Sequence, residues 1–226
     1  MTYLIVVAHP DDEVLGAGAS MYRLVQDGHQ VCVCILSGAV EARRNRPSID
    51  SLHNDVSASL SLLGVTQVTK GNFPNIQFNA APHLHLVRFI EEAIVKYRAE
   101  TIVTHHPNDL NNDHYHTSIA CQAAARLFQR RNDAPPLKEL LFMEVPSATD
   151  WSLRGSSGQF SPNTFVEVGE EAVQRKIEAL AQYRGVMRCY PHPRSAEAIK
   201  ALAVYRGGQA GMMLAEAFES VFRRGL

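Results

Sequence analysis

The 226-residue chain lacks any apolar run long enough to span a bilayer, which excludes a membrane-spanning helix. It also lacks a charge excess: its formal net charge of −1 gives no overall field that would attract nucleic acid or an anionic membrane. The first residues, Met1 to Ala8, lack the basic start and cleavage site of a signal peptide. We therefore expect a cytoplasmic protein with no nucleic-acid partner and no membrane span.

Cysteine is scarce, and none of the four cysteines forms a C-x-x-C pair. This absence argues against a thiolate zinc site and against a redox-active dithiol. Cys32 and Cys34 alternate in an apolar run and Cys121 falls in a helical pattern, so we expect these three to be buried, inert thiols.

What the chain does contain is an alternation of apolar runs and segments with helical spacing. Strands are predicted at Tyr3–Ala8, Val31–Leu36, Thr66–Thr69, Glu100–Thr104, Glu139–Val145 and Thr164–Val168, and helices at Glu13–Asp27, Ile49–Leu63, Pro82–Arg98, Tyr115–Arg131, Glu170–Tyr183, Ala196–Tyr205 and Met212–Phe222. This alternation is typical of an α/β fold in three layers, with a mostly parallel sheet covered by helices on both faces. Because no internal repeat or long linker interrupts it, we expect a single domain over residues 1–226.

A polar cluster, His9-Pro10-Asp11-Asp12-Glu13, directly follows the first predicted strand. Open α/β sheets bind ligands beyond the carboxyl ends of their strands, which is where this cluster falls. Two adjacent carboxylates on one tight turn repel each other, and a divalent cation would remove that cost. A pair of acids that only caps a helix is the alternative, but it leaves His9 unexplained.

A second cluster, from His105 to His116, follows the strand predicted at Glu100–Thr104, so both clusters should meet at one edge of the sheet. A catalytic zinc needs three protein ligands and an open position for water. His9, Asp12 and His114 would supply two imidazoles and a carboxylate, and Asp11 would then be the general base. Asp113 is expected to cap the helix that begins near His114.

The segment from Ala8 to Glu13 resembles the signature of the LmbE-like, or PIG-L, family of zinc-dependent N-acetylsugar deacetylases, and Asp113-His114 resembles the end of that family's second motif. Pro191–Ser195 and Ala215–Phe218 resemble its C-terminal part. The resemblance implies a Rossmann-like sheet, the metal ligands His9, Asp12 and His114, and Asp11 as the base. It also implies zinc, with ferrous iron as an alternative, an N-acetylglucosamine-type sugar or conjugate as substrate, and a possible homo-oligomer.

The chain departs from the family pattern at Asn111, where many members carry a histidine that is thought to assist the transition state. The role could pass to His106 or His192, or Asn111 could donate only a hydrogen bond. We favour His192 as the second catalytic residue, because flanking prolines hold it in one conformation.

Substrate contacts are harder to predict from the sequence. Arg43 follows the second strand and could bind a phosphate or carboxylate, although a solvated basic loop is the commoner structure. Asn108 and Asp109 could bind sugar hydroxyls or could close a turn through their side chains. With Asn111, these residues form the expected substrate-binding set.

Three other functions compete with a sugar deacetylase. A metal-dependent amidase or esterase acting on a non-sugar substrate would use the same groups, and a metal-binding protein without catalysis would keep the ligands alone. A nucleotide-binding module predicts a G-x-G-x-x-G turn after the first strand. The sequence has the acidic cluster there instead, which disfavours that module.

Overall fold

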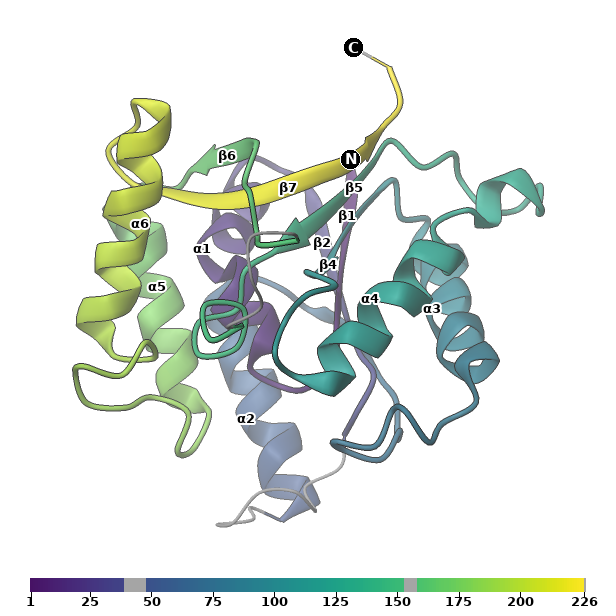
Figure 1. The fold of residues 1–226 in the computed structure, drawn as a ribbon, viewed down its shortest axis with the longest axis horizontal. Helices are drawn as coiled ribbons and strands as arrows, with labels where there is room; N and C mark the ends of the chain where they lie inside the picture. The colour runs from purple at the N-terminus through teal and green to yellow at the C-terminus, as the bar shows by residue number, and fades with distance from the viewer. Residues whose placement is uncertain (39–47, 153–157, 226) are drawn as a thin grey trace.

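The computed structural model describes residues 1–38, 48–152 and 158–225, and these form a sheet of seven strands with helices on both faces (Figure 1). The strands are β1 (Thr2–Val7), β2 (Gln30–Ile35), β3 (Gln67–Lys70), β4 (Thr101–His105), β5 (Glu139–Met143), β6 (Thr164–Glu167) and β7 (Ala215–Arg223). Their order is β3-β2-β1-β4-β5-β7-β6; the first five are parallel, and β7 runs antiparallel to both neighbours. The predicted three-layer α/β fold is confirmed.

Helices cover the two faces of the sheet unequally (Figure 1). One face carries α1 (Asp12–Gln26), α2 (Ile49–Leu62) and α5 (Gly169–Gln182), and the other carries α3 (His83–Tyr97) and α4 (Asn112–Ala124). A further helix, α6 (Ala196–Ala210), packs against α5 and β7. Strand β1 lies between the two layers, and Leu4 to Val7 are at most 1% exposed. Burial on both faces explains its continuous run of apolar residues.

The segment predicted as a helix over Met212–Phe222 is strand β7, so that prediction was wrong. Its alanines and glutamates favour a helix locally, but β7 bonds to β5 on one side and β6 on the other. Ala215 and Phe218, which face opposite sides of the sheet, are both nearly inaccessible to solvent. Pairing on both edges and burial on both faces therefore outweigh the local preference.

The buried cysteines are as expected. Cys32, Cys34 and Cys121 are free thiols without solvent exposure, whereas Cys189 is exposed. Burial raises the pKa of the Cys121 thiol to about 12 and that of Cys32 to about 11, so neither forms the reactive thiolate near neutral pH.

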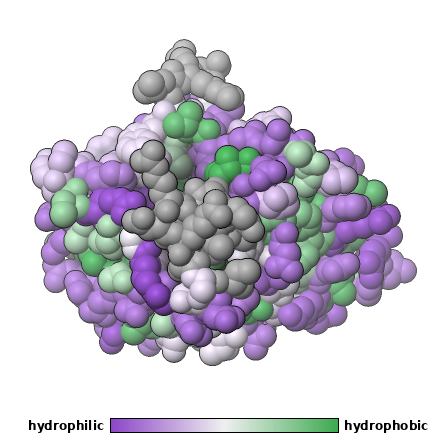
Figure 2. Space-filling model, turned by 90° about the horizontal axis from the view of Figure 1, so that it is seen from below, coloured by the Kyte–Doolittle hydropathy of each residue, from purple (hydrophilic) through white to green (hydrophobic). Residues whose placement is uncertain are grey.

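The carboxyl ends of the parallel strands lie at the bottom of Figure 1, where β1 turns into α1. Figure 2 views the molecule from this side, and the described surface there is mainly hydrophilic with separate hydrophobic spots. Within the described ranges, no helix is long and apolar enough to cross a membrane.

Candidate metal centre

The two polar clusters meet because β1 and β4 are neighbours in the sheet. The turn after β1 carries His9 and Asp12, and the first turn of α4, which follows β4, carries His114. Asp12 Oδ2 lies 3.3 Å from His9 Nδ1 and 3.1 Å from His114 Nε2. The three donor atoms lie within 4.8 Å of one another, and all three side chains are buried.

This donor set fits a divalent cation such as zinc, which two imidazoles and one carboxylate bind with positions left open. In the part of the chain that the structure describes, neither ring nitrogen of His114 has a hydrogen bond of normal geometry, although both are fully buried. A cation bound at Nε2 would give that atom a well-directed partner, which Asp12 Oδ2 at 3.1 Å does not.

The electrostatics of these side chains also favour a bound cation. Burial opposes ionisation of Asp12, but His114 and His9 beside it outweigh burial and hold its pKa well below its ordinary value. Burial opposes protonation of His114 too, yet the carboxylates of Asp12 and Asp109 raise its pKa to about 10. We therefore expect a proton to occupy the site when no metal is bound.

We predict that metal affinity rises with pH, because a metal must displace this proton. The pKa of His114, raised to about 10 in the metal-free protein, keeps the imidazole protonated through pH 6–8. Displacement of one proton should increase affinity by about tenfold per pH unit in that range. Competition titrations at pH 6, 7 and 8 measure the slope, and an affinity independent of pH would contradict the prediction.

Each candidate imidazole ligand has a second carboxylate on its other nitrogen. Asp113 Oδ2 lies 2.9 Å from His9 Nε2, and Asp109 Oδ2 lies 3.1 Å from His114 Nδ1. Asp113 is itself fixed by the backbone N–H groups of Ile76 (2.6 Å) and Phe78 (2.9 Å). Carboxylates in this position orient metal-binding histidines and increase their basicity.

Replacing Asp113 with asparagine should therefore weaken metal binding by about 10- to 100-fold, the usual effect of losing such a partner. The amide would turn a donor toward groups that already donate, so His9 would lose its orientation. Metal titration by calorimetry tests this, with Asp133→Asn as the control, because Asp133 is an exposed partner of Arg131. Equal affinity in both variants would remove Asp113 from the site.

A second group, His105, Asp109 and His114, also has its donor atoms within 4.8 Å of one another. His105 Nε2 accepts a hydrogen bond from the backbone N–H of Ala8 at 2.9 Å, so its lone pair is already used. Burial lowers the pKa of His105 to about 3, and its neutral ring stacks on His114 with centroids 3.8 Å apart. This second group is buried behind the first, and neither His105 nor Asp109 lines the cleft described next.

The first group instead opens into a cleft of about 600 Å³, within the size range of small-molecule sites. The lining residues are His9, Asp11, Asp12, Asn75, Ile76, Leu110, Asn111, His114, Ser147, Ala148, Trp151, Arg184, Gly185, Val186, Arg188 and Arg194. A substrate in this cleft can thus reach the His9–Asp12–His114 group directly.

Asp11 lies at the start of α1 with φ of 101°, in the left-handed region that non-glycine residues rarely adopt. The carboxylate of Glu13 accepts the backbone N–H of Asp11 at 3.1 Å and holds this turn. Arg194 Nη1 lies 3.8 Å from Asp11 Oδ2. The turn therefore places the Asp11 side chain in the cleft, beside the three candidate ligands.

The other residues expected in the site lie in different places. Asn111 lines the cleft and caps α4 by accepting the backbone N–H of Asp113 at 2.9 Å, so the expectation that Asp113 is the cap was wrong. Asp109 is buried against His114, where Thr149 Oγ1 donates to it at 2.8 Å. Asn108 Nδ2 donates to the backbone oxygen of Gly158 at 2.6 Å.

The candidate histidines outside the centre are also separated from it. His106 faces a different cavity of about 220 Å³, and its Nε2 lies 3.4 Å from Glu219. His192 is not among the residues that line the cleft; its ring packs edge-on against Trp151, which does line it, with centroids 5.4 Å apart. Arg43 lies outside the described residues.

Sequence reasoning missed the carboxylate partners and the arginines of the cleft. Asp109 and Asp113 precede His114 by five positions and by one, and this closeness in sequence could have indicated them. Arg184, Arg188 and Arg194 come from the segment between α5 and the start of α6, and nothing in the local pattern connects that segment with the first cluster.

The chain is 28% identical over 189 residues to the "Uncharacterized deacetylase YaiS" of Escherichia coli K12, covering 80% of this chain and 89% of that protein.

Three solved structures share the fold. The 4-carboxy-2-hydroxymuconate hydratase GalB of Pseudomonas putida KT2440 has a TM-score of 0.77 and 19% identity, with 100% of this chain and 98% of that one covered. The N,N'-diacetylchitobiose deacetylase of Pyrococcus horikoshii has a TM-score of 0.76 and 16% identity (97% and 83% covered), and the teicoplanin deacetylase Orf2 in a zinc-inhibited form has a TM-score of 0.78 and 15% identity (99% of each chain covered). The model of the family "PIG-L: GlcNAc-PI de-N-acetylase" matches residues 4–125, more than half of the chain, and the protein therefore belongs to the PIG-L family.

Proposed function

We propose that the protein is a metal-dependent hydrolase that removes the N-acetyl group from an N-acetylglucosamine-type sugar or sugar conjugate. The observation that carries the proposal is the buried His9–Asp12–His114 group, which opens into a cleft beside Asp11. Membership of a de-N-acetylase family and likeness to deacetylases support the reaction type. One continuous sheet supports treating residues 1–226 as a single deacetylase domain.

In this proposal His9, Asp12 and His114 hold the cation. A bound zinc or ferrous ion would polarise the acetyl carbonyl and make water more acidic. Asp11 accepts a proton from the attacking water through its carboxylate, and returns it to the sugar nitrogen as the C–N bond breaks. The fixed turn at Asp11 keeps the carboxylate in position, so little reorganisation accompanies the proton transfer.

For the hydrogen-bond donor to the developing oxyanion, we propose Asn111 rather than His192 or His106. Asn111 lines the cleft with Asp12 and His114, whereas His192 lies against Trp151 and His106 faces another cavity. The side-chain oxygen of Asn111 accepts the N–H of Asp113, which leaves its NH₂ group as the donor.

We expect Asn111→Asp to lower kcat by about 10²- to 10³-fold, the usual effect of losing an oxyanion donor. Aspartate keeps the oxygen that caps α4, so the fold should survive the change. Steady-state acetate release from Asn111→Asp and His192→Ala compares the candidates. A normal kcat for Asn111→Asp, with a large loss for His192→Ala, would return the role to His192.

Acetate release from a panel of N-acetylated sugars and sugar conjugates tests the proposed function itself. The protein is reconstituted with zinc or with ferrous iron in turn, because excess zinc could inhibit, as in the structure of Orf2. Release that depends on added metal and is lost on chelation is the expected result. N-acyl amino acids and simple esters serve as non-sugar substrates in the same panel.

The hydratase GalB has the same fold, so the fold alone does not choose between hydrolysis and addition of water to a double bond. Hydration of an unsaturated carboxylate without acetate release from any amide would contradict the proposed function. Tight metal binding with neither activity would instead indicate a metal-binding protein without catalysis.

A further inference from the structure

Helix α1, which begins at the candidate ligand Asp12, is broken at Ala17, where φ is −143° and ψ is 16°. In a regular helix the N–H of Ala19 would donate to the backbone oxygen of Leu15. At the break these groups bond elsewhere. Ala19 N–H donates to Glu216 Oε1 at 3.2 Å, and Ser20 N–H donates to Glu216 Oε2 at 2.7 Å.

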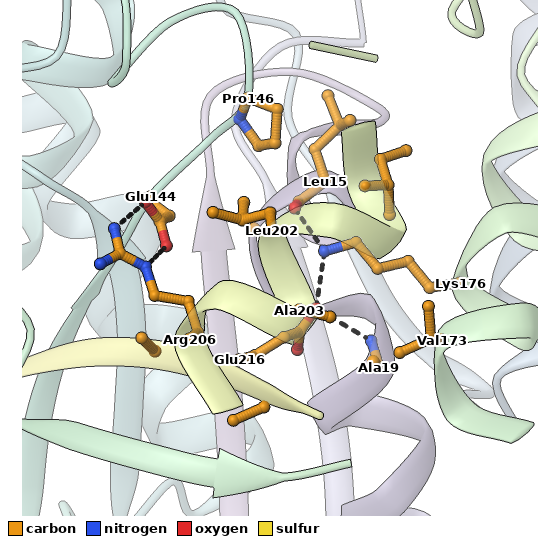
Figure 3. A pocket seen from close by; sticks show the side chains of 14 residues that line it. Leu15, Ala19, Glu144, Pro146, Val173, Lys176, Leu202, Ala203, Arg206 and Glu216 are labelled. Carbon is orange, nitrogen blue, oxygen red and sulfur yellow. Dashed lines mark hydrogen bonds and ion pairs between the residues drawn. The ribbon is translucent and has the colours of Figure 1, made fainter. Parts of the chain in front are cut away.

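The backbone oxygen of Leu15 accepts a hydrogen bond from a side chain of α5 instead (Figure 3). Lys176 Nζ, from α5, donates to it at 2.7 Å and to Glu216 Oε1 at 2.6 Å. One buried ion pair therefore takes the place of the missing helical hydrogen bonds, with Lys176 on the oxygen and Glu216 on the amides.

This pair is shielded from solvent. Lys176 is 5% exposed and Glu216 is 7% exposed, and the cavity beside them has a volume of only about 20 Å³. Such a space holds about one water molecule, so the two charges depend on each other and on the broken helix. Because a buried ion pair is weak evidence for stability, its place in this fold calls for another explanation, such as fixing one conformation.

A second contact from α5 reaches the same segment. Tyr183, seven residues after Lys176, is the C-cap residue that directly follows α5, and its hydroxyl donates to Glu13. Glu13 in turn accepts the backbone N–H of Asp11. Lys176 thus holds the end of the first turn of α1 through Leu15, and Tyr183 holds its start through Glu13.

We propose that Lys176, Glu216 and Tyr183 are positioning residues that fix the first turn of α1, so that Asp12 meets the metal and Asp11 meets the attacking water. The assignment rests on the proposed function for its chemistry, and on the hydrogen bonds of the break for its structure. It goes beyond the proposed function because it places control of the site in α5 and β7.

Loss of the Lys176–Glu216 pair and loss of the Tyr183–Glu13 contact should have different effects. The double variant Lys176→Met with Glu216→Leu removes both charges but keeps apolar volume, and apolar replacement of a buried pair is commonly tolerated. We expect about 10- to 100-fold weaker metal binding, as for other groups that support a ligand. Tyr183→Phe should lower kcat at least as much as it weakens metal binding, because Asp11 is not itself a ligand.

Tyr22→Phe is the matched control, since Tyr22 Oη donates to Glu171 Oε1 at 2.7 Å in another polar contact between α1 and α5. It should change neither metal affinity nor kcat. Both site variants should also speed hydrogen exchange of the Val14 and Leu15 amides, which donate to the oxygen of Asp11, by about tenfold or more relative to the control.

A lower thermal midpoint in the double variant and Tyr183→Phe, with wild-type metal affinity, kcat and amide exchange, would overturn the proposal, because it would mark a purely structural role. If the wild-type protein bound no metal, the proposed function would fail. The exchange of Val14 and Leu15 would then decide whether α5 fixes this segment.

Discussion

His114→Ala is expected to abolish tight metal binding, with a larger loss of affinity than Asp113→Asn produces. His114 Nε2 is one of the two imidazole donors in the candidate group. Without it only His9 and Asp12 remain, and two ligands are fewer than a catalytic zinc takes from a protein. The change also leaves the buried carboxylates of Asp12 and Asp109 facing each other without a cation between them.

Isothermal titration with zinc or cobalt and the metal content after dialysis measure this loss. His116→Ala is the control, because it removes an imidazole from the same helix but outside the candidate group. One equivalent of metal held by His114→Ala at wild-type affinity would place the metal elsewhere and contradict the assignment of all three ligands.

Asp11→Asn is expected to keep the metal and lose the reaction. A general base typically contributes about 10²- to 10⁴-fold to the rate, and asparagine cannot accept the proton of water. Asparagine tolerates the left-handed backbone conformation that Asp11 adopts, so the turn should be preserved. We therefore expect kcat for acetate release to fall by about that factor, with the metal content unchanged.

Acetate release under saturating substrate, together with metal analysis of the same sample, checks this expectation. Asp27→Asn provides a comparison, since Asp27 is an exposed partner of Arg23 at the other end of α1. Full activity of Asp11→Asn would move the base to another residue, and loss of the metal would identify Asp11 as a ligand.

The parallel half of the fold was predictable because its signals are local. Strands β1, β2, β4 and β5 are short runs that are mostly buried, β3 is a weaker, partly exposed strand at the edge of the sheet, and each helix has its own apolar spacing. The meeting of the two polar clusters also followed from the sequence, since parallel strands end at one edge. His9, Asp12 and His114 could be placed together on that ground.

The antiparallel end of the sheet could not be predicted in the same way. The sequence of β7 favours a helix, and only its pairing with β5 and β6 makes it a strand. Likewise, aspartate is a residue type that favours helix caps, so the sequence suggested that role for Asp113. Its contact with His9 instead depends on the approach of α4 to the turn after β1. Both depend on neighbours far away in the chain.

Strand β7 has a consequence for synthesis of the protein. Glu216, which bonds the broken part of α1, is separated from Ala19 by 197 positions and emerges from the ribosome long after the metal ligands. A nascent chain can display His9, Asp12 and His114 while the first turn of α1 still lacks its support. We expect that tight metal loading waits for β7, so that incomplete chains compete poorly for the cell's zinc or iron.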